Sequence, residues 1–232
     1  MEVLWQGLRQ AGELILTADA ELLRILVLSL AVSASATALS ALVGIPAGAA
    51  LAVGRFRGRG VVQTLVNTGM GLPPVVVGLV ITILLWRTGP LGFLGLLYTP
   101  AAMVLAQFTV AAPIAAGFTQ AALELLEPDL AGALRVDGAG SAKLAQELCR
   151  AALPQVLVAV AAAFGRAIAE VGASLMVGGN ILGQTRTLTT TITLVTSRGE
   201  FGLAIALGII LLALALLVNA GLTWRARAAV AA

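Results

Sequence analysis

The chain of 232 residues is 59% hydrophobic and only 11% charged, with a formal net charge of +3. Soluble domains are about 25% charged, so a soluble fold of this composition would expose far too much apolar surface, and we predict a membrane protein. Histidine is absent and Cys149 is the single cysteine, which excludes internal disulfides, Cys/His zinc sites and histidine acid–base chemistry. The arginines stand singly or in short loops, which argues against a nucleic-acid partner.

Residues 1–21 form a predicted amphipathic segment ahead of the strongly apolar part of the chain. It carries Trp5, Leu8 and Ile15 together with several acidic residues. This pattern is typical of a helix that lies along a membrane surface. The segment lacks the basic start and the cleavable small-residue site of a signal peptide, so insertion is expected to depend on the first true span.

Five stretches are long and apolar enough to cross a bilayer, which takes about 20 residues of helix. We therefore predict an all-α membrane protein with about five transmembrane helices, a transmembrane domain over residues 22–224 and a tail over 225–232. The predicted spans are Leu22–Val53, Val61–Trp86, Leu94–Leu123, Ala151–Val177 and Phe201–Trp224.

The basic residues of the short connections predict the orientation of these spans. If the spans alternate, one side receives Arg55, Arg57 and Arg59 in a compact juxtamembrane link, together with the basic residues of 135–150 and of the tail. The other side receives fewer basic residues, scattered singly. We therefore expect the N-terminus outside the cell and the C-terminus in the cytoplasm.

The second span contains the sequence GLPPVVVGL, with the consecutive prolines Pro73 and Pro74. Two prolines unwind a helix locally and expose backbone carbonyl groups. At membrane depth such groups are tolerated only against protein or a water-filled cavity. Pro73 and Pro74 are therefore candidates for the lining of an internal path.

Residues 124–150 are too polar to span a membrane and too regular in pattern to be a loose loop. Glu127-Pro128-Asp129 is a helix start, residues 137–141 read as a glycine turn, and Ala142–Arg150 restarts as a second helix. The pattern predicts two short helices on the cytoplasmic side, joined at Gly138, that form a docking surface for another protein.

A second polar interruption, VGGNILGQTRTLTT over Val177–Thr190, separates the last two predicted spans. Its glycines, Gly178, Gly179 and Gly183, permit tight turns. Its polar side chains are those of Asn180, Thr185, Arg186, Thr189 and Thr190. On the residues alone, this segment is either a functional element or a turn that only connects two spans.

Residues 133–154 resemble the cytoplasmic coupling motif of ABC-transporter permeases, in which Gly138 matches the motif glycine. Two positions depart from the pattern: Gly132 stands where an acidic residue is usual, and Leu153-Pro154 lies slightly late. Phe164–Leu194 is similar to the corresponding segment of oxyanion importers, most of all to tungstate permeases and then to molybdate permeases. The resemblance covers most of residues 25–222.

The resemblance implies the type I importer permease fold, a homodimer with the path between its subunits, and an extracytoplasmic oxyanion-binding protein as partner. It also implies a separate ATPase subunit, in keeping with the sequence, which contains no G-K-[ST] and so no P-loop of its own. We therefore expect no enzyme activity, cofactor or metal in this chain. The ATPase would dock on Ala133, Leu134, Asp137, Gly138, Ala139, Gly140 and Ser141.

An imported tetrahedral dianion would need hydroxyl and N–H donors without a deep charge trap. The candidates for the path or its gate are Pro73, Pro74, Arg166, Glu170, Gly178, Gly179, Asn180, Thr185, Arg186 and Thr189. Arg166 and Glu170 lie one helical turn apart in the predicted fourth span. They form either a structural ion pair, which we favour because such a pair fits within one rigid helix, or a contact on the path.

Three alternatives to tungstate import stay open. The same architecture could carry molybdate or sulfate. A passive anion channel is a different class of function, although it leaves the polar cytoplasmic double helix unexplained. An intramembrane enzyme is disfavoured, because Glu170 is the only acidic residue deep in a predicted span.

Overall fold

The computed structural model describes the chain except for residues 1, 18–19, 127–131, 135, 137 and 232. Within the described residues the regular structure is entirely helical, which confirms the predicted all-α class. The helices are α1 (Glu2–Thr17), α2 (Ala20–Val53), α3 (Arg59–Met70), α4 (Pro74–Leu85), the 3-10 helix η1 (Gly92–Leu94), α5 (Pro100–Glu124), α7 (Ser141–Ala151), α8 (Leu153–Ile168), α9 (Gly172–Gly178), α10 (Leu188–Ser197) and α11 (Phe201–Ala231).

Three described helices are long and apolar enough to cross a membrane: α2, α5 and the Phe201–Ala226 part of α11. They correspond to the first, third and fifth predicted spans. The two bent helix pairs α3–α4 and α7–α8 raise the number to five if each pair counts as one span. The third span begins at Pro100 rather than at Leu94, because Gly95 and Tyr98 have positive φ angles that a helix cannot contain.

The second span is broken at Pro73–Pro74, as the two prolines predicted, and the fourth span is broken where the sequence predicted a continuous helix. Between Met70 and Pro74 the chain turns by 106°, because Pro73 is extended and neither proline can donate a helical N–H bond. The predicted span Ala151–Val177 breaks after Ile168 and restarts at Gly172. Both breaks fall at positions where the chain leaves the direction of the bundle.

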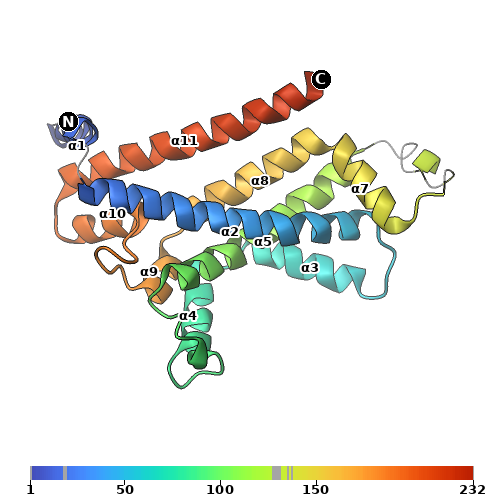
Figure 1. Cartoon of the computed structure of the whole chain (residues 1–232), viewed down its shortest axis with the longest axis horizontal. Coiled ribbons are helices and arrows are strands. Elements are labelled where there is room, and N and C mark those ends of the chain that lie inside the picture. The colour runs from blue at the N-terminus through green and yellow to red at the C-terminus, as the bar shows by residue number, and fades with distance from the viewer. Residues whose placement is uncertain (1, 18–19, 127–131, 135, 137, 232) are drawn as a thin grey trace.

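The long helices lie side by side, with α4 projecting from the bundle (Figure 1). The closest approach is between α2 and α5, where small residues meet. A Cβ atom on Gly48 would lie 2.3 Å from the Ala116 carbonyl oxygen, so a larger side chain would force these helices apart. Where α2, α5 and α8 meet, one buried cluster of the core consists of alanines. They are Ala36, Ala111, Ala115, Ala163 and Ala167.

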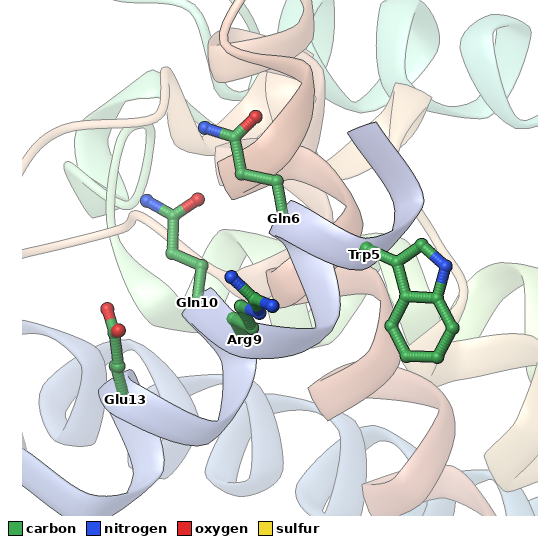
Figure 2. A pocket seen from close by; sticks show the side chains of 5 residues that line it. All are labelled: Trp5, Gln6, Arg9, Gln10 and Glu13. Carbon is green, nitrogen blue, oxygen red and sulfur yellow. The ribbon is translucent and has the colours of Figure 1, made fainter. Parts of the chain in front are cut away.

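Helix α1 is seen nearly end-on in Figure 1, while α2 and α11 run across the view. It packs on the start of α11, where a Cβ atom on Gly7 would lie 2.5 Å from Ile205 Cγ2. Figure 2 shows five side chains of this helix that line an open hollow on its surface. They are Trp5, Gln6, Arg9, Gln10 and Glu13. The helix is amphipathic, and its position on a membrane surface stays a prediction.

One end of the bundle gathers the arginine-rich link after α2, the end of α5 and helix α7. An apolar cluster there includes Leu123, Leu144 and Leu148. Arg59 Nη2 lies 2.9 Å from Glu124 Oε1, and Arg59 Nε donates to the Leu51 carbonyl at 2.7 Å. The C-terminus lies toward this end and the N-terminus toward the other (Figure 1), as an odd number of crossings requires.

Candidate functional site

The break between α8 and α9 is organised around one buried carboxylate, that of Glu170, which is only 1% exposed. Its Oε2 accepts a hydrogen bond from Arg166 Nη1 of α8 at 2.6 Å, and its Oε1 accepts one from the Ala173 N–H in the first turn of α9 at 2.9 Å. A carboxylate at a helix N-terminus satisfies a free N–H group and complements the helix dipole. Glu170 therefore joins the end of one helix to the start of the next.

The sequence analysis expected Arg166 and Glu170 to pair within one rigid helix, and the single rigid helix is the part of this prediction that is wrong. The pair forms, but α8 ends at Ile168, so the ion pair spans the break. The Thr189 hydroxyl of α10 also donates to the Glu170 carbonyl oxygen, at 3.0 Å. Three helices thus converge on Glu170, and a movement of α9 relative to α8 would have to disturb these bonds.

Between α9 and α10 the polar segment Gly178–Thr187 is folded around Thr185, which is fully buried. The Thr185 hydroxyl donates to the Gly178 carbonyl at 2.6 Å and accepts from the Ile181 N–H at 2.9 Å. Gly179, Asn180 and Gly183 all take positive φ angles, as the predicted tight turns require. The sequence indicated the turns but not the threonine that closes them.

The two ends of this polar segment are fixed to two other parts of the bundle, and its last residue caps α10. The Tyr98 N–H, just before α5, donates to the Val177 carbonyl at 2.8 Å. Ser29 of α2 accepts from the Leu188 N–H at 2.9 Å, at the start of α10. A capping box of Thr187 and Thr190 begins α10. The segment is a built element of the fold rather than a loose connection.

The hydroxyl groups of Thr185, Thr189 and Thr190 are buried and engaged inside the protein. In this conformation they stabilise the polar segment, and their role in lining a path stays a prediction. Among the described residues, the buried polar atoms left without a hydrogen-bond partner include Arg186 Nε and Asn180 Oδ1. Within the segment, these two side chains therefore have buried atoms with unused bonding capacity.

The Pro73–Pro74 break lies against the same region. In the first turn of α4, Val75 contacts Gly172, where an added Cβ atom would meet Val75 Cγ2 at 2.8 Å. One turn further, a Cβ atom on Gly78 would lie 2.7 Å from the Ala173 Cα atom. The structure thus brings the two broken spans together, with the turn after Pro73 next to the helix that Glu170 caps.

Two polar residues that the sequence analysis did not select also lie here. Gln107 of α5 and Ser174 of α9 are buried, and Gln107 Nε2 donates to Ser174 Oγ at 3.4 Å. Gln107 Oε1 has no partner among the described residues. A glutamine in the middle of a predicted apolar span was the signal that could have identified this position.

The predicted coupling residues lie at the opposite end of the bundle. Gly138 has a φ of 80°, and the Ala139 N–H donates to the Leu134 carbonyl at 3.0 Å, a bond typical of a helix that ends at a left-handed glycine. Ala133 and Gly138 are exposed, whereas Gly140 and Ser141 begin α7. Asp137 lies outside the described residues. Helix α8 runs from the end of α7 to the break at Glu170.

The geometry defines a helical membrane protein with an exposed turn at one end and a hinged polar element toward the other. Residues 44–229 match the family of binding-protein-dependent transport system inner membrane components. The chain belongs to this family and is a multi-pass membrane protein of a transport system.

Its relatives include the tungstate uptake system permease protein of Peptoclostridium acidaminophilum, 39% identical over 95% of this chain and 96% of that one. A probable anion ABC transporter permease of Haloferax volcanii is 45% identical over 86% and 88% of the two chains. The fold is similar to that of a bacterial alginate ABC transporter solved with its periplasmic protein. There the TM-score is 0.69 and the identity 22%, over 94% of this chain and 84% of that chain.

The contacts of Glu170 lead to a prediction that separates its charge from its capping role. Arg166→Ala strands a buried carboxylate and should lower the free energy of unfolding by about 3 kcal/mol. The double variant Arg166→Ala with Glu170→Gln removes the charge but keeps an oxygen for the Ala173 N–H, so it should recover most of the loss. Arg166→Ala with Glu170→Ala lacks that acceptor and should stay about 1 kcal/mol lower. Unfolding of the purified variants in detergent measures the order.

The matched control is Arg150→Ala, which breaks the exposed pair between Arg150 and Glu147 on α7. An exposed pair contributes about 0–1 kcal/mol, so this variant should resemble the wild type. If Arg166→Ala is as stable as Arg150→Ala, and the two double variants are alike, the carboxylate does not hold the break together.

Proposed function

We propose that this chain is the membrane permease subunit of an ATP-driven importer for tungstate. The observation that carries the proposal is the 39% identity to a tungstate uptake permease over nearly the whole of both chains. A second tungstate permease, from Campylobacter jejuni, is 35% identical over 71% of this chain. Molybdenum permeases are also related, for example at 32% identity over 77% of this chain in Bacillus subtilis, but they cover less of it than the first relative does.

We further propose that a separate ATPase subunit supplies the energy and docks on the turn at Gly138. The exposed left-handed glycine turn and the short helix α7 support this placement. Helix α8 begins immediately after α7, at an angle of 83° to it, and ends at the Glu170 break. A displacement of α7 by the ATPase would therefore be carried along α8 to the helix junction that Glu170 holds.

The ion would pass between two copies of this chain, beside the polar segment that follows α9. Support comes from the meeting of the α4 and α9 breaks at Gly172, which places both broken spans beside each other. An extracytoplasmic binding protein would deliver the ion to this segment.

Uptake into vesicles tests the transported ion. Vesicles that contain the permease and its ATPase, with a tungstate-binding protein added, should accumulate tungstate. They should do so only when ATP is present on the side of the membrane where the ATPase lies. Excess sulfate should leave uptake unchanged, whereas molybdate should compete according to its affinity for the binding protein. Uptake of sulfate in place of tungstate would refute the substrate, and ATP-independent equilibration would indicate a channel.

We also propose that the N-terminus lies outside the cell and the C-terminus in the cytoplasm, and this orientation can be tested separately. Gln184 and Arg57 are both exposed and belong to opposite ends of the bundle. In a Cys149→Ala background, an impermeant thiol reagent added to intact cells should label Gln184→Cys and not Arg57→Cys. Labelling of both after membrane disruption is the control for reactivity. The reverse pattern in intact cells would invert the proposed orientation.

The coupling proposal predicts a selective loss at Gly138. A β-branched residue cannot easily take a φ of 80°, and no atom lies within 4 Å of an added Cβ, so Gly138→Val should distort the turn without a clash. Substrate-stimulated ATP hydrolysis by the reconstituted complex should fall at least about tenfold, while membrane insertion is unchanged.

Two variants serve as controls for the coupling experiment. Gly138→Asn should retain most of the stimulation, because asparagine tolerates the left-handed conformation. Gly132→Val places the same side chain in the same segment, at a glycine with open surroundings and no positive φ. Full stimulation in Gly138→Val would place the docking surface elsewhere.

A further inference from the structure

A groove of about 720 Å³ lies between the first turns of α2 and the polar segment that precedes α10. Its walls are aliphatic and its mouth is polar. The walls are formed by Leu23, Ile25, Val27, Leu28, Ala31 and Leu182, and the polar side chains are those of Glu21, Arg24, Gln184 and Arg186. Leu23 and Val27 are 47% and 65% exposed, so the groove is open along α2.

The polar end of the groove has an excess of positive charge and an unused donor. Glu21 is the acidic residue of the groove, and its Oε1 lies 3.5 Å from Arg186 Nη1. Arg24 has no ion pair among the described residues. Arg186 Nε is buried and has no hydrogen-bond partner there. A buried N–H group without an acceptor is costly. Two arginines and one glutamate therefore leave a site for one anionic group between Arg24 and Arg186.

The walls distinguish between the possible anions. A hydrated oxyanion would need polar groups on all sides, whereas this groove continues into an aliphatic surface along a helix that crosses the membrane. Arg24 stands in the second turn of α2, at the level where the charged side chains of a span reach the lipid headgroups. The ligand that fits has an anionic head and an aliphatic tail.

We propose that this groove binds an anionic phospholipid of the membrane, with its phosphate between Arg24 and Arg186 and one acyl chain along Leu23, Val27 and Ala31. Arg186 belongs to the polar segment, and Arg24 belongs to α2. The bound lipid connects the polar segment to α2 in the same place as the weak Glu21–Arg186 pair. Its phosphate lies beside the guanidinium of Arg186, which lines the polar end of the groove.

Binding of phosphatidylglycerol to the purified permease, with phosphatidylcholine as the neutral lipid, tests the proposal. Native mass spectrometry should find phosphatidylglycerol retained in preference, and thermal unfolding should occur at a higher temperature in its presence. Arg24→Gln removes the charge, and Ala31→Trp fills the groove with an indole while all charges remain. Arg24→Gln should reduce retention of phosphatidylglycerol at least about fivefold, the effect expected of one arginine near an anionic lipid surface. Ala31→Trp should reduce it at least as much, because the indole occupies the space of the acyl chain.

Two matched variants control for charge and size. Arg198→Gln removes an exposed arginine that does not line the groove, and Leu42→Trp adds an indole to an exposed position of α2 beyond it. Both should retain phosphatidylglycerol like the wild type, and cooperative unfolding of all four variants shows that each is folded.

Three results would overturn the proposal. The first is equal retention of the two lipids by the wild type. The second is full retention in Ala31→Trp, which would place the lipid outside the groove. The third is a disulfide between the Ala31→Cys positions of two copies, which would mean that a second copy covers the groove. Because lipid retention is measured without ATPase or substrate, these results are independent of the ion that is transported.

Discussion

A helix that breaks within a membrane protein releases backbone N–H and C=O groups that hydrocarbon cannot satisfy. This constraint governs the part of the molecule where α8, α9 and α10 meet. Where α8 stops, the carboxylate of Glu170 accepts a hydrogen bond from the Ala173 N–H in the first turn of α9. The charge of this carboxylate would itself be costly, and Arg166 offsets it at 2.6 Å. At the far end of α9, the Thr185 hydroxyl donates to the Gly178 carbonyl and accepts from the Ile181 N–H. Glu170 and Thr185 thus satisfy backbone groups at the two ends of α9.

Because these bonds are specific, they also limit how the region can move. Helix α9 is held by Glu170 at its start and by the Tyr98 N–H at Val177. It lies against α4 through Gly78 and Gly172, which leave no space for a side chain. A short helix with fixed ends and close backbone contacts moves as a unit, by exchanging one set of hydrogen bonds for another. The link to this unit from the end of the bundle that holds α7 is α8, which is continuous from Leu153 to Ile168.

The sequence predicted those features that depend on length and composition. The spans α2, α5 and α11 follow from runs of apolar residues, and Pro73–Pro74 identified one of the two breaks. The second break was missed because residues 167–173, apart from Glu170, are apolar or small and continue a helical pattern without interruption. The i,i+4 spacing of Arg166 and Glu170 is also that of an intact helix. What ends α8 is in part the hydroxyl of Thr189, 19 residues further along the chain, and no local pattern carries that information.

The roles of the threonines were equally beyond local reasoning. Polar residues between two spans indicate exposure to water, yet Thr185 and Thr190 are fully buried, because the turns fold back onto the bundle. Apolar side chains, in contrast, are exposed on the projecting helix α4, at Val75, Leu79 and Ile83. A single chain therefore buries polar atoms without partners, at Gln107 and Arg186, and leaves aliphatic side chains uncovered on α4. Both features are those of a subunit that is completed by its surroundings, the aliphatic side chains by a second copy or lipid and the polar atoms by an anionic group or water.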